Sequence, residues 1–263
     1  MVKNYFFNGN TKVVDGVTLK QIECEEYGVG GWIESESNLA QEGTCWVSDD
    51  AMVYGNAKVS NMARVWGNAR VYGNAEVCAM SGVSGNAQVY GNAHLYNTAQ
   101  VWDSAQVYDD AELYNCAKVC GKSKVYGNAK IYHFVSVFGR AQVYGNTYLC
   151  DYSEVFDDAQ VYDNAKLGGK AVVSENAKVC GNAFVYNSAR IYGDAKVSRD
   201  ANISGKAEVY GNAHISGKAE VYENAKVADY AEVFGKAEVY GNAEVRGNAR
   251  VDSEVCGNTV IKD

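Results

Sequence analysis

One pattern constrains the fold of this chain more than any other: from Val47 to Val251 an aliphatic residue recurs at every sixth position. All 35 consecutive positions hold Val, Leu or Ile, and four residues after each of them stands a small residue, usually Ala. The unit in its most regular form, at residues 125–130, reads V-Y-G-N-A-K. A fixed short period is typical of repeat proteins, in which each unit packs only on its neighbours. The pattern therefore predicts a solenoid.

The six positions of the unit follow from strand geometry. Side chains alternate between the two sides of a strand, so the aliphatic residue and the small residue two positions before it point inward. The residues that flank the aliphatic one, such as Lys58 and Tyr54, point outward. Two residues remain to turn a corner, most often Gly and then Asn, which both tolerate left-handed backbone conformations. Short strands joined by sharp corners predict a flat-sided coil.

The V-Y-G-N-A repeats resemble the hexapeptide repeat of the left-handed parallel β-helix, which is known from bacterial acyltransferases. The resemblance covers Val47 to Val251, and by spacing it extends back to Ile33. It implies an all-β triangular solenoid with three hexapeptides in each coil of 18 residues. With its N-terminal segment included, the chain also resembles uncharacterised bacterial and phage hexapeptide-repeat proteins, described as acetyltransferases or polymer-forming proteins.

The segments outside the repeat are expected to close its ends. Asp15-Gly16 stands between two short apolar runs, which predicts a β-hairpin. Residues 1–46 are therefore interpreted as an N-terminal cap with a hairpin, residues 47–254 as the β-helix and residues 255–263 as a short C-terminal end. Val255 follows Val251 after four residues instead of six, so the last coil is expected to be pinched.

Composition narrows the function classes. The chain carries 24 basic and 32 acidic residues, interspersed, with a net charge of -8, which argues against nucleic acid as a partner. No apolar stretch has membrane-spanning length and the N-terminus lacks a signal-peptide core, so no membrane association and a cytoplasmic location are expected. The eight cysteines do not align one coil apart on one face, which favours free thiols.

Stepping by 18 residues gathers aromatic residues into columns. We define the tyrosine face as the column Tyr54, Tyr72, Tyr90, Tyr108, Tyr126, Tyr144 and Tyr162, together with Gln88, Gln106, Gln142 and Gln160 beside it. Arg70 and Lys124 complete the second column, and no acidic residue falls in it. Such a composition is typical of contact surfaces, where Tyr is enriched and acidic residues are depleted. The alternative is a solvated ladder that only stiffens the solenoid.

The family resemblance also implies a histidine general base, and the chain has three candidates. His94 and His214 take outward positions and are expected to be solvated. His133 replaces the usual Gly of a corner, and an 18-residue step brings Cys116 and Asp151 to the same corner. A thiol, an imidazole and a carboxylate in reach of one another would support nucleophilic or general-base chemistry. No spacing of Cys and His residues predicts a metal site.

Two functions follow from these patterns. The preferred one is a non-catalytic, rigid β-solenoid that acts as a scaffold or binding module without a cofactor. Its partner would be a second copy of the chain, a glycan or another protein. The alternative, implied by the resemblance alone, is an acyltransferase that uses acetyl-CoA or another acyl-CoA, with His133 as general base.

Overall fold

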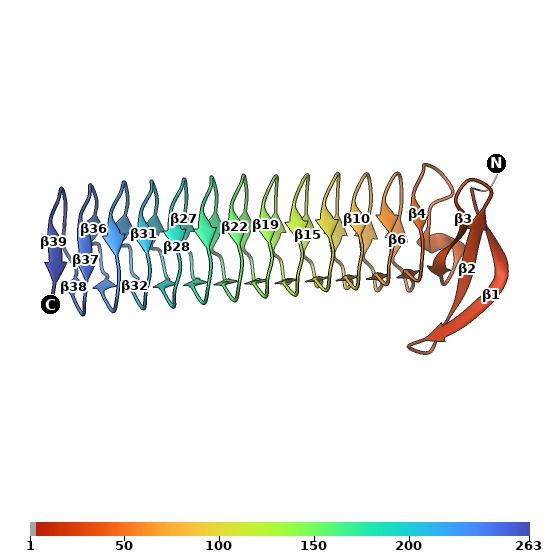
Figure 1. The fold of residues 1–263 in the computed structure, drawn as a ribbon, viewed down its shortest axis with the longest axis horizontal. Helices are drawn as coiled ribbons and strands as arrows, with labels where there is room; N and C mark the ends of the chain where they lie inside the picture. Colours follow the sequence, from red (N-terminus) through yellow and green to blue (C-terminus); the bar gives the residue numbers. More distant parts are fainter. Residues whose placement is uncertain (1–3) are drawn as a thin grey trace. The chain divides into compact units, whose positions relative to one another are not determined.

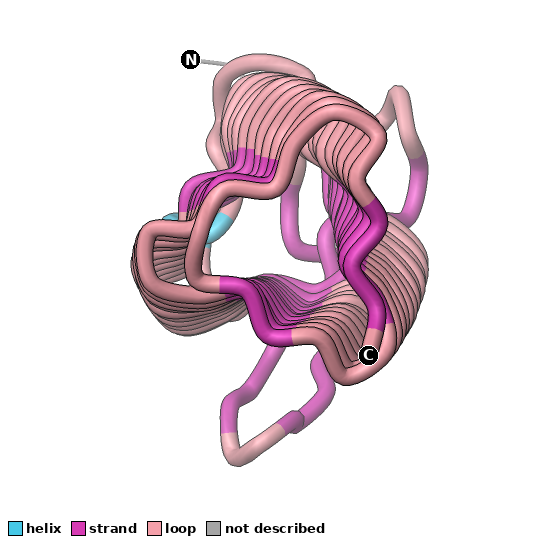
Figure 2. The backbone as a smooth tube through the Cα atoms, turned by 90° about the vertical axis from the view of Figure 1, so that its left-hand side faces the viewer, coloured by secondary structure: helices cyan, strands magenta, loops and turns pink. Residues whose placement is uncertain are grey.

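The structure is a computed structural model that describes residues 4–263, and the chain divides into two compact units, residues 1–128 and 129–263. Both units are built on one plan. Two-residue parallel strands pair at intervals of 18 residues, as in Val71 with Val89 in the first unit and Val161 with Val179 in the second. The fold is a left-handed parallel β-helix with three hexapeptides in each coil, as predicted. Successive strands belong to three different sheets in turn. Figure 2 shows these strands end-on, joined by the corners.

The strands form three sheets in each unit, which we name A, B and C. In the first unit, sheet A holds β5 (Met52–Val53), β8 (Arg70–Val71), β11 (Gln88–Val89), β14 (Gln106–Val107) and β17 (Lys124–Val125). Sheet B holds β6 (Lys58–Val59), β9 (Glu76–Val77), β12 (His94–Leu95) and β15 (Glu112–Leu113). Sheet C holds β4 (Trp46–Val47), β7 (Arg64–Val65), β10 (Gly82–Val83), β13 (Gln100–Val101) and β16 (Lys118–Val119).

The second unit repeats this order. Sheet A holds β20 (Gln142–Val143), β23 (Gln160–Val161), β26 (Lys178–Val179), β29 (Lys196–Val197), β32 (His214–Ile215), β35 (Glu232–Val233) and β38 (Arg250–Val251). Sheet B holds β18 (Lys130–Ile131), β21 (Tyr148–Leu149), β24 (Lys166–Leu167), β27 (Phe184–Val185), β30 (Asn202–Ile203), β33 (Glu220–Val221) and β36 (Glu238–Val239). Sheet C holds β19 (Ser136–Val137), β22 (Glu154–Val155), β25 (Val172–Val173), β28 (Arg190–Ile191), β31 (Glu208–Val209), β34 (Lys226–Val227), β37 (Glu244–Arg246) and β39 (Val260–Lys262).

The N-terminal end of the first unit carries the predicted hairpin. Strands β1 (Phe6–Val14) and β2 (Val17–Cys24) pair antiparallel around Asp15 and Gly16, whose φ values of 52° and 79° suit a two-residue hairpin turn (Figure 1). Strand β3 (Gly28–Ile33) pairs antiparallel with β2 and parallel with β5, where Ile33 lies opposite Val53. The strand register of the β-helix therefore begins at Ile33. The 3-10 helix η1 (Glu36–Asn38) follows within that first coil.

The interior of each unit consists of the two inward positions of the hexapeptide. The aliphatic residues from Val65 to Val245 and almost every small residue before them have an exposed fraction of 0% or close to it. Because burial of apolar surface contributes about 25 cal/mol per Å², this continuous column is the main stabilising element of the coils. The last coil of the second unit is shorter than the others: Val245 pairs with Ile261, 16 residues on, so the predicted pinch is confirmed.

The corners differ from the prediction in one respect. Only the first corner residue, usually Gly, has a positive φ, as at Gly91 with 70° and His133 with 62°. The Asn at the second position stays outside the left-handed region and donates a hydrogen bond along the edge instead. Asn74 donates from Nδ2 to Asn92 Oδ1 at 2.9 Å, and similar bonds recur at other corners. Asn therefore occurs at this position because its side-chain amide forms hydrogen bonds, and not because it tolerates a left-handed backbone conformation.

Carboxylates at the first corner position have a regular role of their own. The side chain reaches the next coil and accepts a hydrogen bond from the backbone N–H of its corner residue. Examples are Asp109 with Gly127 at 3.2 Å, Asp163 with Gly181 at 3.0 Å and Glu175 with Gly193 at 3.0 Å. The corner amide is therefore a donor that can bond an oxyanion offered by the preceding coil.

Candidate functional site

The tyrosine face forms as an ordered stack of rings in the first unit. The rings from Tyr54 to Tyr126 lie with successive centroids 4.8–5.1 Å apart and with interplanar angles of 2–5°. In the second unit Tyr144 and Tyr162 stack in the same way at 5.1 Å. The predicted ladder is confirmed within each unit. Because each ring covers the face of its neighbour, the ladder presents ring edges and hydroxyl groups outward.

The environment of the ladder is amide-rich and partly desolvated. Gln88 and Gln106 lie on the strand positions beside the rings and are half-buried, and the Tyr72 hydroxyl donates to Gln88 Oε1 at 3.2 Å. Burial raises the pKa of Tyr72 and of Tyr108 to about 12, with a smaller contribution from the neighbouring phenols. These phenols stay neutral donors and acceptors at any physiological pH.

One end of the face departs from the prediction. Tyr54 is only 8% exposed because Leu19 of β2 and Met52 of β5 pack against it, so it belongs to a small core beneath the hairpin. The Tyr54 hydroxyl donates to Asp15 Oδ2 at 3.3 Å, and Arg70 Nη1 lies 3.5 Å from the same oxygen. The hairpin turn therefore brings a carboxylate to a face predicted to have none, and the open part of the first unit's ladder begins beyond Tyr72.

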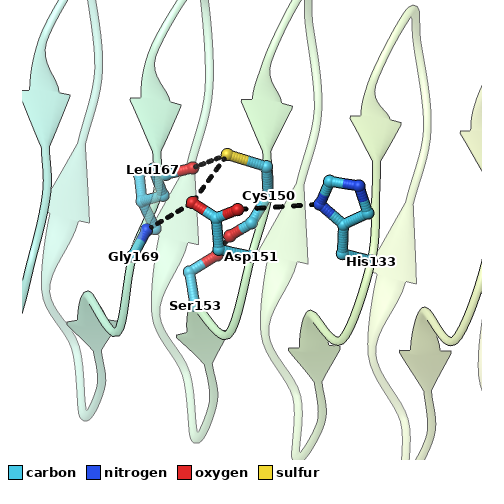
Figure 3. A network of polar contacts seen from close by, with 6 residues as sticks. All are labelled: His133, Cys150, Asp151, Ser153, Leu167 and Gly169. Carbon is cyan, nitrogen blue, oxygen red and sulfur yellow. Dashed lines mark hydrogen bonds and ion pairs between the residues drawn. The ribbon is translucent and has the colours of Figure 1, made fainter.

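The predicted catalytic corner brings two of its three residues together. His133 Nδ1 and Asp151 Oδ1 lie 3.6 Å apart, on successive corners between sheets B and C of the second unit (Figure 3). Both side chains are about half exposed, at 51% and 48%, so the pair lies on an open edge. Cys116 belongs to the first unit, where its Sγ lies 3.2 Å from Thr98 Oγ1. Its approach to His133 stays a prediction.

Asp151 has the corner role described above. Its Oδ2 accepts from the backbone N–H of Gly169 at 2.9 Å, and this hydrogen bond is the main cause of a lowered pKa for the carboxyl group. His133 replaces Gly at a left-handed position, with φ of 62°. A separation of 3.6 Å is longer than the 2.6–3.2 Å typical of a working acid–base pair. The geometry accounts for Asp151 as a structural carboxylate and leaves His133 as an accessible imidazole beside it.

The structure also places a thiol here that the sequence reasoning missed. Cys150 Sγ lies 3.5 Å from Asp151 Oδ2 and 3.6 Å from the Leu167 carbonyl oxygen (Figure 3). Burial, followed by the Asp151 charge, raises the pKa of the Cys150 thiol to about 11. A thiol that stays protonated is a poor nucleophile, so this position favours packing over covalent chemistry. The sequence feature that could have revealed this thiol is that Cys150 directly precedes Asp151.

The other two histidines are less exposed than predicted. His94 Nδ1 lies 3.5 Å from Glu76 Oε2 and 3.2 Å from the Tyr96 hydroxyl, between neighbouring coils of sheet B. His214 Nε2 lies 3.2 Å from Ser198 Oγ on sheet A. Burial lowers the pKa of His214, and the nearby Lys196 adds to this effect. Both side chains are packed against their neighbours, because outward side chains one coil apart cover each other.

Two further properties concern residues 4–263 as a whole. Among these residues no cluster of three or more His, Cys, Asp or Glu side chains is arranged to hold a metal ion. No helix within the same range is long and apolar enough to cross a membrane.

Comparison with known proteins adds two similarities, and no family model matches the chain. A stretch of 41 residues is 46% identical to the uncharacterized acetyltransferase YdcK of Escherichia coli (strain K12). That stretch is 15% of this chain and 13% of YdcK, so the chain matches only a small part of that protein. The Francisella novicida UDP-N-acetylglucosamine acyltransferase structure is 17% identical, with a TM-score of 0.35 over 78% of this chain and 66% of that one.

The 18-residue coils and unbroken hexapeptide register define the class. The chain is a hexapeptide-repeat protein with the left-handed parallel β-helix fold.

Proposed function

We propose that this chain is a rigid, non-catalytic scaffold whose tyrosine face binds a second copy of the chain. The observation that carries the proposal is the ring stack of the first unit, with steps of 4.8–5.1 Å from Tyr54 to Tyr126. The outward groups repeat at the coil spacing, and a second copy repeats at the same spacing. Two such faces can therefore meet at every step along their length.

The chemistry of the face favours a protein partner over a glycan. A sugar ring would need an open aromatic face to stack on, and in this ladder each ring covers the next. What remains outside are hydroxyl groups and the amides of Gln88 and Gln106, which both donate and accept hydrogen bonds. An identical face supplies the complementary groups, and the fixed backbone keeps the ordering cost of association low.

The test is a triple substitution of Tyr90, Tyr108 and Tyr126 by Ser, followed by light scattering over a range of concentrations. The expected result is a self-associating native chain and a variant that stays monomeric. The control is the pair Tyr192 and Tyr210, which stack at 5.0 Å and 3° on sheet C, changed to Ser in the same way. The control variant should keep the native mass. Equal masses for the native chain and the triple variant would refute the proposal.

A second candidate is an acyl-CoA-dependent acyltransferase with His133 as general base. Two observations favour it: the relative that shares the 41-residue stretch is named an acetyltransferase, and His133 lies beside Asp151 at an accessible corner. Acetyl-CoA would be the donor. The hexapeptides between Val47 and Val251 keep an 18-residue register, so such a site would have to be built on the flat coil surface.

Calorimetry with acetyl-CoA tests this second candidate directly. The variant His133→Gly restores the usual corner residue and should fold normally, while His94→Gln serves as the control. Binding of acetyl-CoA at millimolar concentration and turnover lost only in His133→Gly would favour the acyltransferase. No heat of binding to the native chain would rule it out.

A further inference from the structure

The second unit holds a run of basic side chains on sheet A that neither function uses. Lys178 of β26 pairs in register with Lys196 of β29, and Lys196 pairs with His214 of β32. Like charges directly opposite on neighbouring strands destabilise a sheet. On sheet C a carboxylate lies opposite a base, as Glu208 does opposite Lys226, whereas the like charges of Glu220 and Glu238 meet on sheet B. Within residues 4–263 no acidic side chain forms an ion pair with either lysine, so this run is uncompensated.

A fourth basic group stands at the adjacent corner. Arg199 has φ of 62°, a conformation that costs an Arg residue energy and that Gly adopts freely at most first corner positions. Arg199 directly follows Ser198 and stands three residues after Lys196, which pairs in register with His214. The charges of Lys196 and Arg199 both add to the lowering of the His214 pKa by burial. Ser198, only 8% exposed, lies between them, with its Oγ 3.2 Å from His214 Nε2.

The same corner also offers a backbone donor. At Asp151, Asp163 and Glu175 the corner side chain accepts from the corner amide of the next coil. The equivalent amide after Arg199 is that of Gly217, and a guanidinium group cannot accept a hydrogen bond. Within the described range no side chain takes the Gly217 N–H, which is left beside a cluster of positive charge.

Nearby carboxylates do not bind the Gly217 amide or the Arg199 side chain. Glu232 pairs in register with His214 one coil further on, and it only partly offsets the effect of burial on that imidazole. Asp200 follows Arg199 in the chain, but its Oδ1 accepts from Asn182 Nδ2 at 2.9 Å as part of an edge ladder. The carboxylates thus leave the corner amide and the Arg199 side chain available to an external anion.

We propose that this corner is an oxyanion site for a phosphate group, bound by the Gly217 amide and the side chains of Arg199 and Lys196. His214 and Ser198 form its inner wall. Phosphate suits the site better than a carboxylate because it is a dianion with oxygens directed to several sides, and the donors here lie on two successive coils. The group would come either from inorganic phosphate or from a phosphate ester.

The test follows the Gly217 amide by 1H–15N NMR during titration with inorganic phosphate, at an ionic strength held constant with chloride. A saturable shift is expected for the native chain. Arg199→Gly and Lys196→Gln introduce residues that the chain itself uses at equivalent positions, so both should fold. Each should weaken phosphate binding by about tenfold or more, as expected for a lost charge-assisted hydrogen bond.

Two further variants sharpen the test. Lys170→Gln removes one positive charge at a different corner of the same unit, and it should leave phosphate binding unchanged. Arg199→Asp supplies an internal carboxylate to the Gly217 amide and should abolish binding. Glycerol phosphate distinguishes the sources: tighter binding than inorganic phosphate indicates an ester ligand, and equal binding indicates the free anion. No saturable shift, an equal response to acetate, or full binding by Arg199→Gly would overturn the proposal.

Discussion

Replacing Val89 by Asp tests how completely the interior of the coils excludes water. Val89 is fully buried in the first unit, between Val71 and Val107 on the neighbouring coils. Losing the Val side chain costs about 1.5–3 kcal/mol of transfer free energy. The new carboxyl group must also stay protonated, which at pH 7 costs about 4 kcal/mol for a group with a normal pKa of ~3.9. The expected loss in free energy of unfolding is therefore about 5.5–7 kcal/mol at pH 7.

The pH dependence of this loss separates a buried carboxyl group from one that escapes to water. Burial raises the folded-state pKa of the Asp above its unfolded value, so the variant loses stability as pH rises through the range between the two. Val89→Asn has a similar size and does not titrate. The gap between the two variants should widen by about 2 kcal/mol between about pH 6 and pH 7.5.

Urea denaturation followed by circular dichroism measures this gap. The control is Lys118→Asp, which places the same charge on an exposed, outward position of β16 and should change stability by no more than about 0.5 kcal/mol. A gap that stays constant with pH would refute the reasoning, because it would mean that the carboxylate at residue 89 remains hydrated.

Three further predictions concern corners, thiols and phenols. Gly181→Ala should lower the free energy of unfolding by about 1 kcal/mol more than Gly235→Ala, because both have φ of 70° but only at Gly181 would a Cβ lie 2.6 Å from a backbone nitrogen of the next coil; equal losses would contradict this. An alkylating reagent should modify exposed Cys256 well before Cys150, whose pKa is raised to about 11, as followed by mass spectrometry. Equal rates would contradict the raised pKa of the Cys150 thiol. Tyr108→Phe should remove a phenol that titrates near pH 12 in the absorbance titration. Since this pKa lies above the unfolded value of ~10, its contribution to stability is lost as pH rises above about 10. Absorbance lost near pH 10 instead would show that Tyr108 is solvated.

Most of the fold could be predicted from the sequence because the hexapeptide decides the direction of every side chain locally. Alternation fixed the inward Val and Ala, and the 18-residue step placed Tyr90 next to Tyr108. The hairpin turn at Asp15 was predicted by the same local logic. What local logic cannot give is where the hairpin packs, so the burial of Tyr54 and the contact between Asp15 and Arg70 emerged only from the structure.

The candidate sites were predictable in position more than in role. The 18-residue step correctly placed His133 beside Asp151. It did not predict that Asp151 bonds the Gly169 amide, because that role depends on the corner geometry of the backbone. The run of Lys178, Lys196 and His214 was visible in the sequence, but its meaning depends on Arg199 and a free corner amide, which the column pattern does not show.

The most direct test of the proposed scaffold is site-specific photocrosslinking through the tyrosine face. Gln106, which lies on β14 two residues before the half-buried Tyr108 of the ladder, is replaced by p-benzoylphenylalanine, and the attachment site is mapped by mass spectrometry after irradiation. The account predicts a covalent dimer whose attachments fall on the tyrosine face of the second copy, while the same probe at Tyr210 on sheet C gives monomer. A monomer from position 106, or attachments spread over all three sheets, would contradict it.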